Sequence, residues 1–200
     1  MSLDPRRTEQ IFHAAADVFC QQGYARASMD RIAREAGVSK ATLYNHFDSK
    51  STLFRAVVRQ ASEAFVLELD ELALASLPLE DALQTLGHYY LDFLLQERNL
   101  AVVRAVLAES QLDPDLGRAF HESGPAVAQQ AVADLFARRM ASGELPSGDS
   151  AAAARYFVAL LRGDLFWRGL LQVPVSQTER RSHLAGAVRQ FLYGCGSADD

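Results

Sequence analysis

Apolar residues recur along this chain at spacings of three and four positions, the spacing of one face of an α-helix. Near the N-terminus, Ile11, Ala15, Val18 and Phe19 fall on one such face before Gly23. No stretch alternates between apolar and polar residues for long enough to predict a β-strand. The pattern therefore predicts an all-α protein.

Residues that favour the ends of helices mark the expected boundaries. Ser and Asp side chains accept hydrogen bonds from the free N–H groups of a first turn, and glycine closes a last turn. These signals predict about nine helices with short connections and no repeat. The expected starts are Asp4-Pro5, Ser28, Ser39, Asp48 or Ser49, Ser76, Asp113-Pro114, Gly124-Pro125, Asp149 and Ser176, and the expected ends include Gly23, Gly143, Pro174 and Gly194.

Residues 28–47 contain two short predicted helices separated by a tight turn at 36–39. Gly37 can adopt the positive φ that closes the first helix, and Ile32 and Leu43 can meet in a small core. This is the helix-turn-helix pattern, whose second helix enters the DNA major groove. The alternative is an ordinary helical hairpin with a solvated face. The outward residues of the second helix, all able to contact phosphates or base edges, are Lys40, Thr42, Tyr44, Asn45 and His46.

Charge is divided unevenly along the chain. Residues 1–55 hold eight Lys and Arg against six Asp and Glu, whereas residues 56–200 hold twelve against nineteen. Because salt limits the reach of exposed charges to about 8 Å, a local positive excess allows an acidic protein to bind a polyanion. The only lysines, Lys40 and Lys50, both lie in the first segment.

Several classes of protein are not expected from this sequence. The apolar runs are too short to span a bilayer, and the N-terminus lacks the apolar core of a secretory signal. Cys20 and Cys195 form no C-x-x-C pair, so neither a zinc module nor a disulfide framework is expected. No G-x-S-x-G, phosphate-loop or H-E-x-x-H motif occurs. We expect a cytoplasmic protein that is not an enzyme and holds no cofactor and no metal.

Two segments within residues 5–55 carry fixed patterns of residues. The first is Ile11-x-x-Ala14-Ala15-x-x-x-Phe19-x-x-x-Gly23-Tyr24, and the second is Ile32-Ala33-x-x-Ala36-Gly37-Val38-Ser39-Lys40-Ala41-Thr42-Leu43-Tyr44-x-His46-Phe47-x-x-Lys50-x-x-Leu53. They resemble the first helix and the DNA-binding signature of TetR-type transcriptional regulators. This resemblance implies an all-helical homodimer with a three-helix DNA-binding domain over residues 1–55 and a helical domain over 56–200 that binds a small molecule and forms the dimer.

The resemblance also implies roles for single residues. Lys40 and Ala41 would face bases, and the methyl of Ala41, where many members have glycine, could touch a thymine methyl. Asn45 could read adenine or face solvent. The phosphate contacts would come from Ser28, Thr42 (alternatively a base contact), Tyr44, His46 and Lys50.

The C-terminal part resembles AefR-like members of the family over residues 103–116, 141–145 and 153–163. We expect a pocket for a hydrophobic or aromatic effector between its helices, although aromatic residues at helical spacing also occur as plain core. A metal site of His88, Glu109 and His121 is disfavoured because no two of them are four residues apart. The candidate effector-binding residues are His88, Tyr89, Phe93, Arg104, Phe120, His121, Arg162 and Trp167.

The last two long helices are the expected dimer interface, since two helices from each subunit can form a four-helix bundle. The same residues could instead form intramolecular core. They are Tyr156, Leu160, Gly163, Leu170, Leu184, Val188, Phe191 and Leu192.

We therefore expect a ligand-responsive transcriptional regulator that binds a palindromic operator in double-stranded DNA. A repressor released by its effector is the family pattern, with a pivot of the helix over about residues 49–74 separating the two recognition helices. The alternative is a TetR-like DNA-binding protein with a structural role on the chromosome and no effector. The operator, the target genes and the effector are not specified by the sequence.

Overall fold

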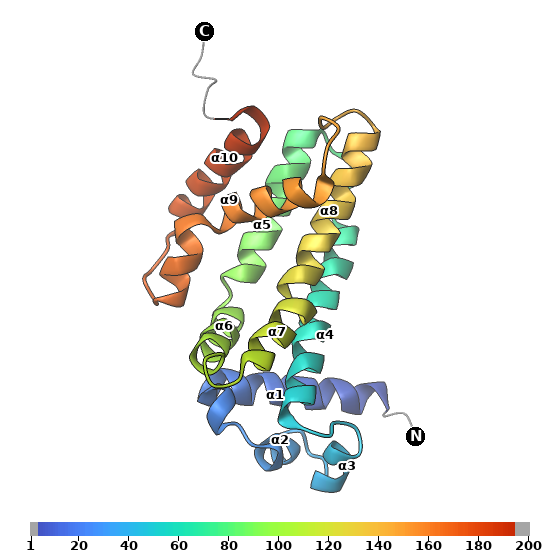
Figure 1. The fold of residues 1–200 in the computed structure, drawn as a ribbon, viewed down its shortest axis with the longest axis vertical. Helices are drawn as coiled ribbons and strands as arrows, with labels where there is room; N and C mark the ends of the chain where they lie inside the picture. Colours follow the sequence, from blue (N-terminus) through green and yellow to red (C-terminus); the bar gives the residue numbers. More distant parts are fainter. Residues whose placement is uncertain (1–3, 195–200) are drawn as a thin grey trace. The chain divides into compact units, whose positions relative to one another are not determined.

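The computed structural model describes residues 4–194. These residues form ten α-helices and one short 3-10 helix, without a strand, so the all-α prediction is confirmed (Figure 1). None of these helices combines the length and the apolar character that crossing a membrane requires. The elements are α1 (Pro5–Arg26), α2 (Met29–Glu35), α3 (Lys40–Tyr44), α4 (Lys50–Glu71), η1 (Leu74–Ser76), α5 (Leu79–Leu94), α6 (Glu97–Glu109), α7 (Pro114–Ser123), α8 (Pro125–Ala141), α9 (Ser150–Leu170) and α10 (Gln177–Tyr193).

Most of the expected helix caps are present. The side chains of Ser39 and Asp149 accept hydrogen bonds from backbone N–H groups of the first turns of α3 and α9. Ser176 and Glu179 form a reciprocal capping box at the start of α10. The start expected at Ser76 was wrong, because Ser76 ends the 3-10 helix η1 and α5 begins after Pro78.

The chain divides into two compact units. The first unit comprises the residues up to 63 together with residues 97–125, and the second comprises 64–96 and 126 onward. The helix-turn-helix therefore shares its compact unit with α6 and α7, a grouping that the expected boundary at residue 55 did not include. That boundary, as a division of function, stays a prediction.

The core of the first unit forms around aromatic side chains of α1 and α4. Phe19 and Phe54 meet edge to face with 5.2 Å between ring centroids, and Tyr24 packs on Phe54 at 5.3 Å. Ala105 of α6 and Leu116 of α7 are buried in the same cluster. Burying a large apolar side chain stabilises a fold by about 1.5–3 kcal/mol. Packing against α6 and α7 therefore contributes directly to the stability of the unit that holds the helix-turn-helix.

The core of the second unit is built from α4, α5, α8, α9 and α10. Phe157 of α9 is fully buried, and its ring lies 5.6 Å from that of Phe136 and 4.9 Å from that of Phe191. Helix α9 is kinked at Gly163, which has φ of 40°. A Cβ at that glycine would lie 2.4 Å from the ring of His183 on α10, so the close approach of these helices requires glycine there.

Candidate nucleic-acid interface

Local hydrogen bonds hold the turn between α2 and α3. Gly37 has φ of 67°, and its N–H donates to the Arg34 carbonyl (3.2 Å) while the next N–H, of Val38, donates to the Ala33 carbonyl (3.0 Å). This pairing of two successive N–H groups with carbonyls of the last turn is the Schellman type of helix end. Ser39 then caps α3 by accepting from the Thr42 N–H at 3.0 Å.

A small apolar core fixes α2 against α3. Ile32 and Leu43 are fully buried, and Ala33 is 3% exposed. Because these buried positions hold one face of α3 inward, its opposite face is presented to solvent. This is the arrangement that a recognition helix needs.

The solvent-facing side of α3 carries most of the predicted DNA-contacting side chains. Lys40, Ala41, Tyr44 and Asn45 are exposed. Thr42 is half-buried, with its hydroxyl 2.8 Å from that of the capping Ser39 and either oxygen able to donate. The exposed groups offer a cation, a methyl group, a phenol and an amide on one surface.

Two further predicted phosphate contacts lie beside α3. Ser28 is exposed and caps α2 by accepting from the Arg31 N–H at 3.3 Å. Its hydroxyl hydrogen stays available, since a capping oxygen acts as acceptor. His46 lies just after α3 and is half-buried.

Lys40 is paired with an acidic residue that sequence reasoning missed. Its Nζ lies 2.8 Å from Oδ1 of Asp30, on α2, and 5.8 Å from the ring centroid of Tyr44. The hydrogen bond to Asp30 raises the pKa of the Lys40 ammonium. Asp30 and Lys40 are ten residues apart in sequence and lie on different helices, so helical spacing could not reveal the pair.

Lys50 lies in a different environment from Lys40. Its Nζ donates to the carbonyl oxygens of Tyr24 (2.7 Å), Ala25 (3.0 Å) and Ala27 (3.2 Å) at the C-terminal end of α1. The ammonium also lies 4.4 Å from the Tyr24 ring centroid, and burial lowers its pKa. An ammonium has three N–H donors. Three carbonyl oxygens of the protein therefore match its three donors, and the phosphate contact expected from the family resemblance stays a prediction.

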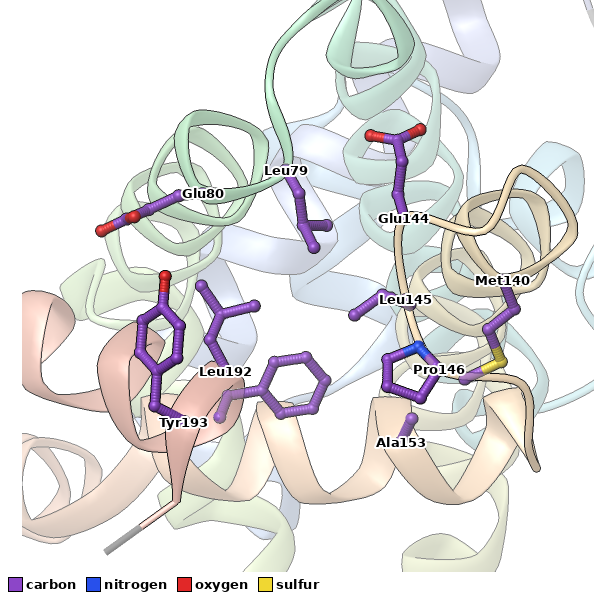
Figure 2. Close-up of a pocket in the computed structure, with 10 residues that line it drawn as sticks. Leu79, Glu80, Met140, Glu144, Leu145, Pro146, Ala153, Leu192 and Tyr193 are labelled. Atoms are coloured by element: carbon purple, nitrogen blue, oxygen red, sulfur yellow. The ribbon is translucent and has the colours of Figure 1, made fainter. Parts of the chain in front are cut away.

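A cavity of about 450 Å³ lies within the second unit, among α5, α8, α9 and α10 (Figure 2). Leu79, Leu145 and Leu192 point toward one another across it, and the carboxylates of Glu80 and Glu144 lie at its rim. Glu144 is held by hydrogen bonds from the Arg139 guanidinium and the Ser142 hydroxyl. The remaining lining residues are Met140, Pro146, Ala153, Phe191 and Tyr193.

None of the eight candidate effector-binding residues lines this cavity. In the second unit, Tyr89 and Phe93 pack around Phe65, with centroid distances of 4.8 and 4.9 Å. Arg162 Nε donates to the hydroxyl of buried Tyr90 at 2.8 Å.

The other five candidates are dispersed. His88 is exposed and Trp167 is 62% exposed, both in the second unit. In the first unit, Arg104 pairs with Glu97, Phe120 packs against the apolar core and His121 is exposed. Across residues 4–194, no group of three or more His, Cys, Asp and Glu side chains is arranged to hold a metal ion.

The candidate interface residues separate into buried and accessible sets. Leu184 and Val188 are at most 1% exposed and Leu170 is 7% exposed, so within the protomer they are core and have no surface to offer a second subunit. Gly163 packs closely against the ring of His183 within the protomer. The accessible members are Tyr156, at 67% exposure, and the half-buried Leu160, Phe191 and Leu192.

The helix-turn-helix has an apolar core, and its second helix exposes a cation and hydrogen-bonding side chains. These features define a DNA-binding regulator. Sequence profiles agree with this class: one described as bacterial regulatory proteins, tetR family, matches residues 11–57, and one described as AefR-like transcriptional repressor, C-terminal domain, matches residues 81–194. The chain belongs to the TetR family of helix-turn-helix transcriptional regulators.

Individual relatives extend over most of the chain. A TetR-family regulator from Mesorhizobium loti MAFF303099 is similar with a TM-score of 0.85 and 28% identity, over 96% of this chain and 98% of its own. The flavonoid-responsive regulator FrrA is similar with a TM-score of 0.74 and 31% identity, over 94% and 96%. The nucleoid occlusion factor SlmA of Vibrio campbellii (strain ATCC BAA-1116) is 30% identical over 118 residues, 58% of this chain and 52% of its own.

Proposed function

We propose that this protein is a transcriptional repressor that binds a palindromic operator as a homodimer and is released from it by a small molecule. The observation that carries the proposal is the solvent-facing side of α3, where Lys40, Ala41, Tyr44 and Asn45 are exposed above a buried core. Lys40 and Ala41 face bases, and Asn45 reads a base beside them. The match to the AefR-like repressor profile over residues 81–194 supports the repressor role.

Phosphate contacts in this proposal come from Ser28, Thr42, Tyr44 and His46. Hydroxyl and imidazole groups of this kind fix the register of a protein on DNA without reading its sequence. Lys50 is omitted from the set because its three N–H donors are bound to carbonyl oxygens of α1 and the residue that follows it. We assign it a structural role instead.

The dimer forms, in this proposal, through the exposed apolar side of α9. Tyr156 and Trp167 are 67% and 62% exposed, and Leu171, directly after the helix, is 72% exposed. Tyr156 and the half-buried Leu160 lie four positions apart before the kink at Gly163, and Trp167 and Leu171 lie four positions apart after it. Large exposed apolar residues that gather on a surface mark sites of association. Two recognition helices about 34–36 Å apart then read two half-sites.

The effector in this proposal is a hydrophobic or aromatic molecule that binds in the cavity among α5, α8, α9 and α10. Its volume of about 450 Å³ falls in the range of small-molecule sites, and its interior is mostly apolar. The similarity to FrrA, a flavonoid-responsive regulator, favours a planar aromatic compound. Effector binding favours a conformation with α4 pivoted, with a coupling free energy of about 1–3 kcal/mol.

Selection from a random-sequence duplex library at a stated salt concentration tests this function. We expect an enriched palindrome with half-sites about one helical turn apart. A Lys40→Met variant should lose part of the sequence preference, whereas Arg59→Met, which removes an exposed positive charge from α4, should retain it. Absence of enrichment by the unmodified protein, after the effector has been removed by refolding, would refute the proposal.

A second candidate function is a structural role on the chromosome without an effector. The similarity to the nucleoid occlusion factor SlmA over 118 residues favours it. This function predicts many dispersed binding sites when the protein is mapped on the chromosome, and no loss of DNA binding with any aromatic ligand. A repressor predicts few sites, close to promoters.

A further inference from the structure

An ion pair stands on the exposed surface of the helix-turn-helix. The Nζ atom of Lys40, the first residue of α3, lies 2.8 Å from Oδ1 and 3.0 Å from Oδ2 of Asp30, the second residue of α2. The two side chains are 61% and 57% exposed. A strong donor and a strong acceptor are therefore presented together, one hydrogen-bond length apart, beside the outward residues of α3.

The Asp30–Lys40 ion pair contributes little to the stability of the fold. Ion pairs exposed to this degree are screened by water and salt and contribute little to folding. For DNA binding in general the carboxylate is unfavourable, because it neutralises Lys40 and is repelled by phosphates. A carboxylate at this place in a DNA-reading surface therefore needs a partner on the DNA that compensates for it.

The major-groove edge of a G·C base pair supplies such a partner. Guanine presents the acceptors O6 and N7, and cytosine presents the N4 amino donor. O6 and N4 are hydrogen-bonded to each other, so that acceptor and donor lie about 2.9 Å apart. The Nζ and the carboxylate oxygens of the protein pair have the same spacing and the complementary order. Lysine with guanine, and aspartate with cytosine N4, are both established side-chain pairings.

We propose that Asp30 and Lys40 act together as one reader of a G·C base pair, with Lys40 donating to guanine O6 and N7 and Asp30 accepting from cytosine N4. This rests on the proposed function, since it requires that α3 enters the major groove. Asp30 is then a specificity-determining residue. Asp30 weakens binding to DNA without a G·C pair at this position, because no cytosine N4 group then compensates for its negative charge.

The test uses the full-length protein and the duplex selected by the unmodified protein, with each base pair of one half-site replaced in turn. Asp30→Asn should lower the preference for G·C at a single position by about tenfold, within the range of one side chain–base pairing, and should strengthen binding to unrelated DNA. Lys40→Met should lose preference at the same position, and the double variant should lose no more than either single one. Glu35→Gln is the matched control, because it removes one exposed acidic charge from the same helix, where it pairs with Arg31.

The outcomes distinguish failure of the Asp30–Lys40 reader from failure of the DNA-binding function. If Asp30→Asn keeps the full preference of the unmodified protein, or if the two variants alter preference at different positions, the reader is refuted while the DNA-binding function stands. If Glu35→Gln lowers the same preference equally, the effect is one of net charge and the reader is likewise refuted. If the unmodified protein selects no sequence, both the reader and the proposed function fail. Far-UV circular dichroism confirms that each variant is folded.

Discussion

Replacing Lys50 with methionine separates a structural lysine from a DNA-binding one. Methionine keeps most of the apolar stem and removes the three N–H donors that bind the carbonyl oxygens of Tyr24, Ala25 and Ala27. A hydrogen bond to a charged group contributes about 1.5–3 kcal/mol net. Two of the three bonds are part-buried and one is exposed, so water replaces some of the lost interaction. We therefore expect a total loss of about 3 kcal/mol, the lower end for two such bonds.

Thermal unfolding followed by circular dichroism measures this loss. For a protein of this size, 1 kcal/mol lowers Tm by about 2–4 °C, so Lys50→Met should unfold about 6–12 °C below the unmodified protein. Lys40→Met is the matched control, because it makes the same substitution at a lysine whose ion pair is exposed. Its Tm should stay unchanged within error.

DNA binding by the same two variants completes the test. Well below its Tm, Lys50→Met should keep the slope of log affinity against log salt, because its ammonium has no donor left for a phosphate. A variant that keeps its Tm but loses about 0.9 from that slope would refute the structural role and restore the phosphate contact implied by the family resemblance.

Three further predictions concern other parts of the molecule. Tyr44→Phe should weaken binding to selected and unrelated duplexes by the same factor, since a phosphate contact carries no sequence information. Fluorescence anisotropy measures the affinity for each duplex. A change in sequence preference would contradict the phosphate contact of Tyr44. The emission of Trp167, the only tryptophan, should shift to shorter wavelength as protein concentration rises through the dimer Kd, and an unchanged spectrum across a transition seen by sedimentation would exclude it from the interface. Hydrogen bonds from Arg168 and Ser176 lower the pKa of Glu179 from 4.5 to about 2. The stabilising effect of the ionised carboxylate is therefore present above pH 4.5 and is lost as the pH falls toward 2. Between pH 4.5 and 2, Tm should fall less steeply with pH for Glu179→Gln than for the unmodified protein.

The features that sequence predicted well are those set by neighbours in the chain. The caps formed by Ser39 and Ser176 bond to groups three residues away, so the residues that determine them can be read directly. The turn at Gly37 is of the same kind, because its positive φ and its two hydrogen bonds involve only the end of α2.

The features that sequence missed depend on contacts between distant residues. Lys50 bonds to carbonyls 23 to 26 residues away, so its position in a family signature did not reveal its partners. Helical periodicity shows which residues share a face but not what covers that face. For this reason periodicity predicted both Leu184 and Tyr156 as interface residues, although Leu184 is buried in the protomer and Tyr156 is exposed. Residue type likewise does not show which side chains share a cavity: none of the eight candidate effector-binding residues lines the one among α5, α8, α9 and α10, and their role stays a prediction.

The position of Lys50 also determines where this protein can be cut for building chimeric regulators. If the recognition segment were transferred to another regulator with a boundary after Phe47, Lys50 would not be transferred with it. The carbonyls of Tyr24 and Ala27 would then lack the donor that they bind in this protein. A boundary at residue 55 would keep Lys50 but remove Ala105 and Leu116 from the cluster around α1. A hybrid that exchanges DNA specificity should therefore change the exposed residues of α2 and α3 within the complete chain, and leave both junctions intact.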